Sequence, residues 1–333
     1  MTMPASVAFR RILLGCAIGL AFATLAGYAG SWRYLEVLGD FRPYYLFAAL
    51  FVLILGIGGA QLEPHRRVSV WTVLLAGLAI IINTGEVAPW IRNSPMAVNR
   101  SPSPTGFRAI SFNVEQNNPH IAETMQYLRA QDADAVVLLE STGSWPGAIR
   151  ELETSYPHHL RLDALTMDVF SRHPLIQTQL HQFGPQRGFV TIELQLPRSR
   201  LWLLAAHACP RHWYGAEGYA ERVRMLEDGI PAAITQLKGP ALVLGDFNAS
   251  VWSPAYKRML HRSHLSDARR GFGLRFTQHG KVFPGNLLWR PIDHCFHTAD
   301  CVPRHFWTGP DLGSDHRPVG VDLEFWPGSN PSR

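Results

Sequence analysis

Short apolar strands that end in polar residues are the feature that most restricts what this chain can fold into. The clearest is Leu242–Gly245, which is followed by Asp246 and Asn248. An apolar run closed by glycine indicates a buried strand that meets a turn. Because side chains two residues apart in an extended backbone point the same way, we expect Asp246 and Asn248 to stand together at the edge of a sheet.

Five further stretches place polar or ionisable residues beside short apolar strands. They supply Asn113 after Ile110–Phe112, Glu140 after Val136–Leu139, His207 after Leu203–Ala206, Asp293 within Pro291–Phe296, and the pair Asp315-His316 before Val319–Phe325. A single strand-end Asp or His is usually structural. Six such positions, all of residue types that bind hard metal ions or move protons, predict one catalytic site.

The order of these residues resembles the endonuclease/exonuclease/phosphatase superfamily. That superfamily includes DNase-I-like nucleases, abasic endonucleases, neutral sphingomyelinases and inositol polyphosphate phosphatases. The resemblance runs from about Phe107 to Phe325, and its most specific parts are Gly245–Asn248 and Ser314–Pro318. It implies a four-layer α/β sandwich, in which two packed sheets are flanked by helices. Helical patterns at 121–130 and at 217–237, the second broken near Gly229–Pro231, permit this architecture.

Hydrolysis of a phosphodiester needs a water aimed in line, neutralised charge on the phosphoryl oxygens and a route for protons. Glu140, at the end of an apolar strand, is the first candidate ligand for a hard ion such as Mg²⁺, with Mn²⁺ as a substitute. Asn113 offers an amide oxygen beside it. The resemblance adds Asp315 to this set of metal ligands.

The resemblance also implies a catalytic set, which is His207, Asp246, Asn248, Asp293 and His316. Asp246 would orient or deprotonate the attacking water, and Asn248 would hold a phosphate oxygen. His316, oriented by Asp293, would act as general base or stabilise the attacked phosphate. His207 would contact the phosphoryl group or the leaving oxygen, although Ala206 replaces the threonine that usually precedes it.

The remaining histidines carry no motif. We expect His294 to point to the face opposite Asp293, and we expect surface or loop positions for His158, His159, His173, His212, His261 and His264. Asp168 is unusual, because the family has small residues at that place in the strand before Ser171–Pro174. A serine hydrolase is excluded by the lack of a Gly-x-Ser-x-Gly elbow, and no Walker loop is present.

Three stretches without charged residues precede the strands. They are Ile12–Trp32, Pro43–Leu62 and Val68–Gly85, of 21, 20 and 18 residues. About 20 apolar residues cross a bilayer as a helix, so we expect three transmembrane helices. The alternative for the first stretch is a cleaved signal peptide, which we consider weaker because two further apolar segments follow it.

The basic residues favour an inside N-terminus, although by a thin margin. Arg10-Arg11 and Arg66-Arg67 flank the stretches on one side, and Arg33 and Arg42 lie on the other. The chain would then be a multi-pass protein of the cytoplasmic membrane with its catalytic domain on the outer side. We expect a membrane anchor at 1–88, a Pro/Ser-rich linker at 89–106 and a catalytic domain at 107–327.

Charge does not indicate a nucleic-acid partner for the whole catalytic part. The net charge is +5, of which +4 belongs to residues 1–104 and +1 to residues 105–333. One basic segment stands out and comprises Lys257, Arg258, Arg262, Arg269, Arg270 and Arg275. It is either a solvated surface or a rim that attracts a phosphate-bearing substrate.

Four cysteines are too few for a disulfide scaffold. Cys295 and Cys301 flank an expected hairpin at 297–300. Their spacing is a poor zinc signal, and a disulfide between them becomes plausible if the domain lies outside the membrane.

We therefore predict a membrane-anchored, metal-dependent phosphoric ester hydrolase. The catalytic set serves nucleases and lipid-headgroup hydrolases alike, so a nucleic acid and a phospholipid headgroup both stay open as substrates. The alternative is a non-catalytic, membrane-tethered binding domain that keeps the fold. The sequence leaves the oligomeric state open.

Overall fold

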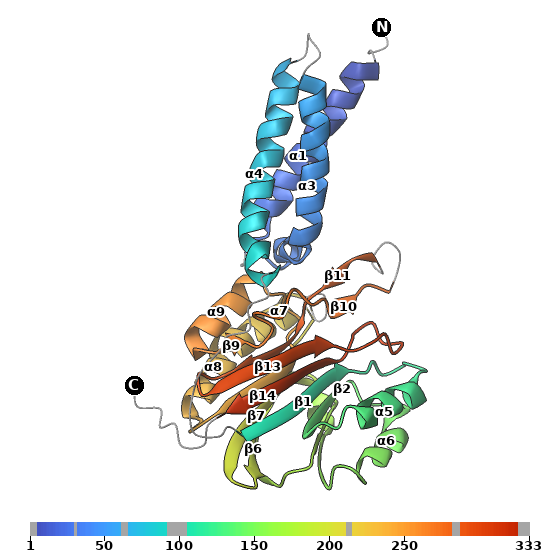
Figure 1. The fold of residues 1–333 in the computed structure, drawn as a ribbon, viewed down its shortest axis with the longest axis vertical. Coiled ribbons are helices and arrows are strands. Elements are labelled where there is room, and N and C mark those ends of the chain that lie inside the picture. Colours follow the sequence, from blue (N-terminus) through green and yellow to red (C-terminus); the bar gives the residue numbers. More distant parts are fainter. Residues whose placement is uncertain are drawn as a thin grey trace. The chain divides into compact units, whose positions relative to one another are not determined.

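The computed structural model describes residues 5–29, 32–60, 66–91, 105–210, 215–281 and 287–325. The chain divides into a helical unit that ends at Ile91 and a larger α/β unit, and each is described by itself (Figure 1). Most of the expected linker at 89–106 lies outside the described residues, because helix α4 ends at Ile91 and strand β1 begins at Thr105.

Three long helices make up most of the helical unit. They are α1 (Ala5–Ala26), α3 (Arg42–Ala60) and α4 (Arg66–Ile91), with the short α2 (Arg33–Glu36) and the 3-10 turn η1 (Val37–Phe41) between the first two. The segments Val7–Ala26, Tyr34–Gly58 and Arg67–Ile91 are long and apolar enough to cross a membrane. The expectation of three candidate spans is therefore confirmed by length and composition.

Polar side chains inside the helical unit bond to one another. Nδ2 of Asn83 donates to Oγ1 of Thr24 at 2.8 Å, and Nη1 of Arg42 donates to Oδ1 of Asn83 at 3.2 Å. The guanidinium of Arg42 also lies 4.1 Å from the ring centroid of Tyr28. Polar groups in a segment surrounded by lipid need such partners, so these contacts link α1, α3 and α4 through their interior.

Two six-stranded sheets form the centre of the α/β unit among the described residues. The first contains, in order, β13 (Cys301–Thr308), β14 (Val319–Phe325), β1 (Thr105–Asn113), β2 (Ala135–Leu139), β4 (Met167–Ser171) and β3 (His158–Leu162). The second contains β5 (Leu175–Gly184), β6 (Arg187–Leu196), β7 (Ser199–His207), β8 (Ala241–Asp246), β12 (Asp293–His297) and β9 (Ser266–Asp267). A separate pair is formed by β10 (Gln278–His279) and β11 (Trp289–Arg290).

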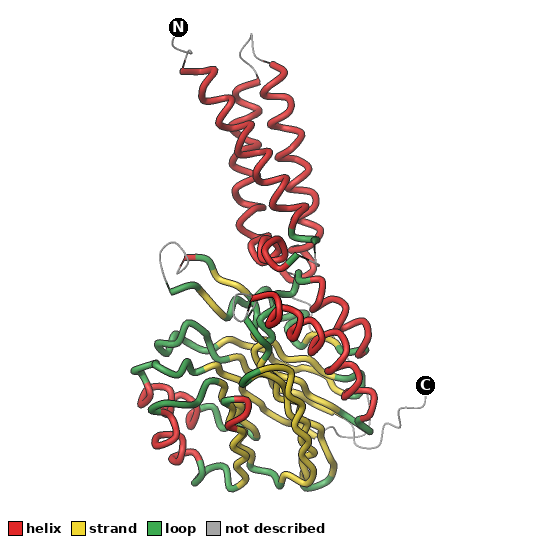
Figure 2. The backbone as a smooth tube through the Cα atoms, turned by 180° about the vertical axis from the view of Figure 1, so that it is seen from behind, coloured by secondary structure: helices red, strands yellow, loops and turns green. Residues whose placement is uncertain are grey.

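Helices cover the outer faces of the two sheets (Figures 1 and 2). Against the first sheet lie α5 (Ile121–Ala130), α6 (Trp145–Ala148) and η2 (Ile149–Leu152), and η3 (Asp163–Leu165) joins β3 to β4. Beside the second sheet lie α7 (Gly215–Arg224), the π-helical turn η4 (Met225–Gly229), α8 (Ile230–Gln236) and α9 (Pro254–Ser263). The four-layer α/β sandwich is confirmed, and so is the interruption of the helix near Gly229.

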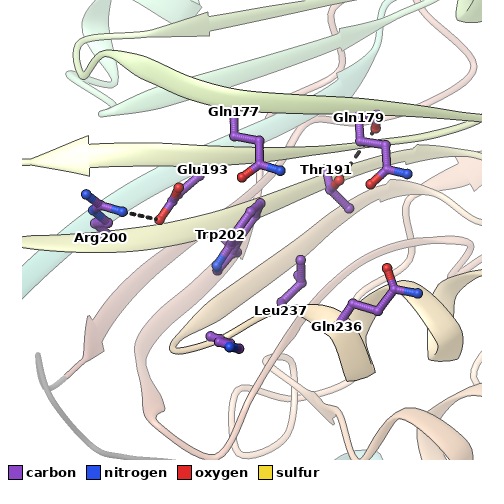
Figure 3. Close-up of a pocket in the computed structure, with 9 residues that line it drawn as sticks. Gln177, Gln179, Thr191, Glu193, Arg200, Trp202, Gln236 and Leu237 are labelled. Carbon is purple, nitrogen blue, oxygen red and sulfur yellow. Dashed lines mark hydrogen bonds and ion pairs between the residues drawn. The ribbon is translucent and has the colours of Figure 1, made fainter.

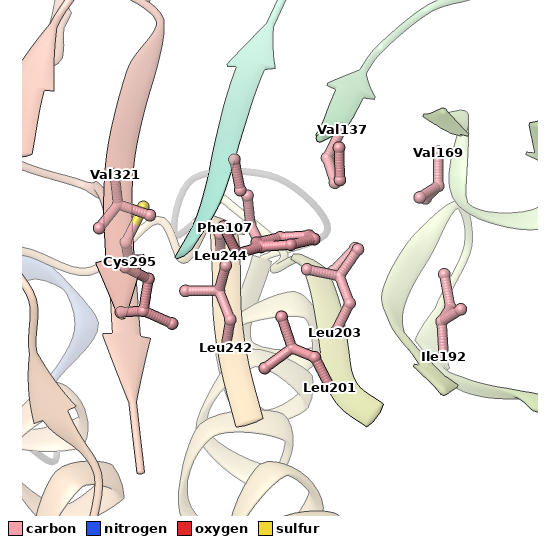
Figure 4. Packing of buried hydrophobic residues seen from close by; sticks show 14 of the residues in the cluster. Phe107, Val137, Val169, Ile192, Leu201, Leu203, Leu242, Leu244, Cys295 and Val321 are labelled. Carbon is pink, nitrogen blue, oxygen red and sulfur yellow. The ribbon is translucent and has the colours of Figure 1, made fainter. Parts of the chain in front are cut away.

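Apolar side chains from both sheets form the core. Figure 4 shows Val137 and Val321 from the first sheet facing Leu203, Leu244 and Ile192 from the second. All five are fully buried. Burial of one such side chain contributes about 1.5–3 kcal/mol, so the inner faces of the sheets hold the sandwich together.

The strand register brings the predicted site residues together. Strands β7 and β8 run parallel with His207 beside Asp246, and β12 runs antiparallel to β8 with Asp293 opposite Asp246. In the first sheet β1 runs parallel to β2, and Asn113 lies beside the residue that precedes Glu140. Parallel strands present their carboxyl ends at the same edge of a sheet, and the antiparallel β12 begins at that edge with Asp293, which is why these side chains meet.

The expected hairpin between Cys295 and Cys301 is wrong. Cys295 lies in β12 of the second sheet, and Cys301 begins β13 of the first. The residues between them carry the chain from one sheet to the other, whereas a hairpin would need both strands in one sheet. Both cysteines are buried and free.

Gly245 is required by the close packing of β7 against β8. Its φ is +144°, and a Cβ at this position would lie 1.9 Å from the carbonyl oxygen of Ala206. No other residue type fits there without separating the two strands that carry His207 and Asp246.

We expect Gly245→Ala to lower the free energy of unfolding by about 3 kcal/mol or more, because the methyl group meets backbone atoms that cannot move aside. Denaturant unfolding of the full-length protein in detergent, followed by tryptophan fluorescence, measures this. Gly147→Ala is the matched control, since nothing lies within 4 Å of a Cβ there. Equal midpoints for the two variants would contradict the steric account.

Candidate functional site

His316 lies between two carboxylates of the second sheet. Its Nδ1 lies 3.0 and 2.9 Å from the two carboxylate oxygens of Asp293, and its Nε2 lies 3.8 Å from Oδ2 of Asp246. The exposed fractions of Asp246, Asp293 and His316 are 1%, 2% and 6%. These three side chains are thus shielded from water, and each lies within a few ångströms of the charges of the other two.

Asn248 reaches Asp246 through a turn, and not through an extended backbone as predicted. Strand β8 ends at Asp246, and Asn248 has a left-handed φ of +47°. Its backbone N–H donates to Oδ1 of Asp246 at 2.8 Å, and its Nδ2 donates to Oδ2 of Asp246 at 3.1 Å. Nδ2 also donates to the carbonyl of Ala208 at 3.0 Å, so both amide hydrogens of Asn248 are bonded within the protein.

Asn113 connects this group to Glu140. Its Nδ2 donates at 3.3 Å both to Oε1 of Glu140 and to Oδ2 of Asp246. Its Oδ1 accepts a hydrogen bond from the backbone N–H of Glu115 at 3.2 Å. Asn113 therefore holds two carboxylates from different sheets side by side.

Glu140 stands directly after β2 in a left-handed conformation, with φ +57°. Its Oε1 lies 3.6 Å from Nε2 of His207 and 3.6 Å from Nη2 of Arg187. Burial, together with the charges of Arg187 and His316, holds the pKa of His207 well below 6.5, so its ring is neutral. The side chain of Glu140 is 26% exposed, which leaves it open to a ligand.

Asp315 lies in a second polar group, which contains Gln278, Glu115 and Lys281. Oδ2 of Asp315 accepts a hydrogen bond from Nε2 of Gln278 at 3.1 Å, and its backbone N–H donates to Oε2 of Glu115 at 3.3 Å. The ammonium of Lys281 pairs with Glu115, and the charges of Asp315 and Glu140 act on it as well. This end of the site thus already stabilises one cation among three carboxylates.

Proton affinity is raised at both Asp246 and His316. Burial raises the pKa of Asp246, and the neighbouring carboxylate of Asp293 raises it further, to about 7. Burial alone would lower the pKa of His316, but the charges of Asp293 and Asp246 outweigh it and raise the pKa to about 10. At neutral pH the imidazole is therefore protonated, and Asp246 is poised to gain or lose a proton.

The donor set suits a hard divalent cation. Carboxylate and amide oxygens with imidazole are ligands for Mg²⁺ or Mn²⁺, and none of the eight predicted residues is a cysteine. Ligand atoms of Asp246, Asp293 and His316 also lie within 4.8 Å of one another. The predicted metal ligands Glu140 and Asp315 lie outside this group of three.

Three charged residues of the site were not predicted from the sequence, namely Arg187, Glu115 and Lys281. Arg187 begins β6, which runs antiparallel to β7, so the start of one strand lies beside the end of the other, with Gly188 paired to His207. A search confined to the carboxyl ends of strands misses such a residue. Of the three, Glu115 is the one that the sequence could have indicated, because it stands two residues after the predicted ligand Asn113.

Of the histidines without a motif, His294 is buried and His159 is half-buried. His294 points away from Asp293 as predicted, and its Nε2 donates to the carbonyl of Ala249 at 2.8 Å. The surface or loop position predicted for His159 is wrong, because His159 lies in β3 and its Nε2 lies 2.7 Å from Oδ1 of Asp168. His212 lies outside the described residues.

The basic segment does not form one exposed rim. Arg258 and Arg262 of α9 pair with Glu227 and Asp228, and Arg269 is buried with 1% of its surface exposed. These three of its six basic residues are therefore paired or buried within the protein, and Lys257, Arg270 and Arg275 are exposed.

A cavity of about 480 Å³ lies on the outer face of the second sheet (Figure 3). It is lined by Gln177, Gln179, Thr191, Glu193, Arg200, Trp202, Gln236, Leu237 and Lys238. None of the predicted site residues contributes to its lining, so this cavity is separate from the candidate site.

Comparisons with known proteins agree with this geometry. Residues 110–316 match the family model described as Endonuclease/Exonuclease/phosphatase family. A comparison with curated proteins found no match. Humanized D. rerio TDP2 has a TM-score of 0.54 at 15% identity, with 66% of this chain and 98% of that chain covered.

Two further solved structures are similar. Sphingomyelinase C from Streptomyces griseocarneus has a TM-score of 0.51 at 17% identity, covering 66% of this chain and 99% of that chain. Beta toxin from Staphylococcus aureus with bound magnesium ions has a TM-score of 0.51 at 14% identity, covering 65% and 99%. At these identities the likeness shows a shared fold. The predicted resemblance is thereby confirmed.

We expect His316→Gln to lower the free energy of unfolding by about 3 kcal/mol at pH 6.5 in EDTA, because the buried carboxylate of Asp293 loses the cation that it pairs with. The pKa of His316 is raised in the folded state, so its contribution is complete below pH 6.5 and is lost as the pH rises towards 10. The gap between wild type and variant should therefore shrink with rising pH.

Denaturant unfolding at several pH values measures this gap. His305→Gln is the control, since the side chain of His305 is 58% exposed. A gap that stays constant from pH 6.5 to pH 10 would show that the charge of His316 does not stabilise the fold.

Proposed function

We propose that the chain, which belongs to the Endonuclease/Exonuclease/phosphatase family, is a membrane-anchored phosphoesterase that hydrolyses phosphodiester bonds with the help of a divalent metal ion. The observation that carries the proposal is the junction made by Asn113. Its amide joins Asp246, within reach of His316, to Glu140. Proton transfer and charge neutralisation would thus act on one phosphate.

The raised proton affinities support a division of labour in the catalytic set. Asp246, with a pKa near 7, would orient the attacking water and take its proton. His316, held by Asp293 and protonated at neutral pH, would stabilise the negative charge of the attacked phosphate. Of the two roles open to His316 from the sequence, we therefore favour charge stabilisation over general base.

Asn248 is better suited to hold Asp246 than to hold a phosphate oxygen. A phosphate oxygen needs a hydrogen-bond donor, and both amide hydrogens of Asn248 are bonded to Ala208 and Asp246. We propose that Asn248 keeps the carboxylate of Asp246 turned toward the water. The neutral ring of His207, 3.6 Å from Glu140, would donate to the phosphoryl group or the leaving oxygen.

Glu140 and Asp315 would hold the metal ion, because the charges of both already act on the ammonium of Lys281, which pairs with Glu115. Asn113 would have to turn its oxygen toward the ion to act as a ligand, because its nitrogen faces Glu140 here. When bound, Mg²⁺ or Mn²⁺ would neutralise charge on the phosphoryl oxygens. The magnesium ions of the similar beta toxin support this choice of ion.

We favour a phospholipid headgroup over a nucleic acid as the substrate. The similar structures include both a sphingomyelinase and a TDP2 complexed with single-strand DNA product. Residues 105–333 carry a net charge of only +1, however, and Arg258 and Arg262 are paired within the protein. Binding of nucleic acid depends on unpaired basic groups, whereas an anchor places a lipid substrate within reach.

We further propose that the N-terminus lies on the cytoplasmic side of the cytoplasmic membrane and that the catalytic domain lies on the outer side. Of the two arginines expected on the outer side, Arg42 is buried against Asn83 inside the helical unit. Arg10 on the inner side is buried as well, and Arg33, Arg92 and Arg100 would stand on the outer side, so the proposal rests on the placement of Arg10-Arg11 and Arg66-Arg67 as adjacent pairs in short segments.

Glu140→Gln should abolish turnover, and excess EDTA should do the same to the wild type, because both remove the metal ion. His316→Ala should lower kcat by at least about 10²-fold. Full-length protein in detergent would be assayed on sphingomyelin, single-stranded DNA and bis(p-nitrophenyl) phosphate. Glu123→Gln is the matched control, as the side chain of Glu123 is 61% exposed on α5.

Each outcome of this assay separates the alternatives. Hydrolysis of sphingomyelin but not of DNA supports the lipid proposal, and the reverse refutes it. Full activity in EDTA would refute the metal dependence. Binding of a phosphoester without turnover on any of the three substrates would favour the non-catalytic binding domain.

A C-terminal alkaline phosphatase fusion should be active, and a C-terminal green fluorescent protein fusion should be dark. Both results follow from three membrane crossings that begin inside the cell. The opposite pattern would place the catalytic domain in the cytoplasm and would make an intracellular phosphoester the better substrate.

A further inference from the structure

Asp168 is a buried carboxylate within a strand of the first sheet. It lies in β4, and its side chain has no exposed surface. Its neighbours in the strand, Met167, Val169 and Phe170, are buried and apolar. A carboxylate there is costly to bury, so its presence calls for a specific role.

Three donors converge on this carboxylate. Oγ of Ser141 donates to Oδ2 at 2.5 Å, and Nη1 of Arg161 donates to the same oxygen at 3.0 Å. Nε2 of His159 donates to Oδ1 at 2.7 Å. His159 and Arg161 come from β3, the edge strand paired with β4. Both oxygens of Asp168 are therefore bonded, and the arrangement is fully satisfied.

Ser141 links this network to Glu140, the residue before it. Besides its hydroxyl, Ser141 uses its backbone N–H, which donates to the carbonyl of Thr166 at 3.3 Å, and its carbonyl, which accepts from Arg161 at 3.5 Å. Ser141 is thus held at three atoms. Because Glu140 adopts a left-handed conformation that its own side chain disfavours, these contacts fix the direction in which its carboxylate points.

We propose that Asp168 is a positioning residue that sets the affinity of Glu140 for a divalent cation, acting through Ser141. The proposal rests on the proposed function, in which Glu140 holds the ion. Residues that orient a metal ligand without touching the metal change its affinity by about 10–100-fold when they are substituted. We therefore expect a substitution of Asp168 to change the affinity for the metal ion and not the rate of the chemical step.

Asp168→Asn tests this, because it keeps the shape of the side chain but replaces an acceptor oxygen by a donor. Binding of Mn²⁺ to the full-length protein in detergent, measured by calorimetry, should weaken by about 10–100-fold. The Mg²⁺ concentration for half-maximal turnover should rise by the same factor. Turnover at saturating Mg²⁺ should stay within about three-fold of wild type, a split that a general loss of structure would not give.

Asp322→Asn is the matched control. Asp322 lies in the same sheet and forms a two-pronged pair with Arg108, at 2.6 and 3.0 Å, without touching Glu140 or Ser141. Its loss should leave Mn²⁺ affinity unchanged. If Asp168→Asn does not fold, Ser141→Ala takes its place, since it removes only the hydroxyl that joins Asp168 to the turn, and about 10-fold weaker Mn²⁺ binding is expected.

The same calorimetry separates the two proposals. Wild-type Mn²⁺ affinity in Asp168→Asn or, failing that, in Ser141→Ala would overturn the role of Asp168. A fall in turnover at saturating Mg²⁺ with unchanged affinity would overturn it as well. Wild-type affinity in Glu140→Gln would instead refute Glu140 as the metal ligand, and with it the proposed function.

Discussion

The contact of His316 with Asp293 and Asp246 is the interaction on which the rest of the candidate site depends. Two carboxylates lie there almost without water, and their mutual repulsion is tolerable only because a protonated imidazole lies between them. The same electrostatics give Asp246 a proton affinity suited to neutral pH. Asn113 then extends the group to Glu140, the ligand that we propose for the metal ion.

The fold and the meeting of the site residues could be predicted because they follow from local patterns. Apolar runs that end in a polar residue give strands, and the carboxyl ends of parallel strands such as β7 and β8 share one edge. Gly245 is required because β7 and β8 approach too closely there for a Cβ atom. The sequence still indicates this position, since the glycine closes the apolar run. Apolar length predicted the helical unit in the same way.

The remaining features depend on contacts between distant segments. Arg187 reaches Glu140 because β6 runs antiparallel to β7, and Lys281 reaches Glu115 across 166 positions of sequence. Asn248 turns back on Asp246 because β8 ends at Asp246, two residues before Asn248, and Asn248 adopts a left-handed conformation. The pairing of His159 with Asp168 needs the register of β3 on β4. Neither spacing nor composition encodes these partners.

The two sheets each contribute half of the site. Asn113 and Glu140 extend from the first sheet, while Asp246 and Asp293 belong to the second, and the hydrogen bond from Asn113 to Asp246 crosses between them. The apolar layer that separates the sheets therefore acts as the spacer of the catalytic groups. A core substitution that lets one sheet slide by a fraction of an ångström would separate these groups while the protein is still folded, so the proposed activity would be a more sensitive gauge of the interior than the melting temperature.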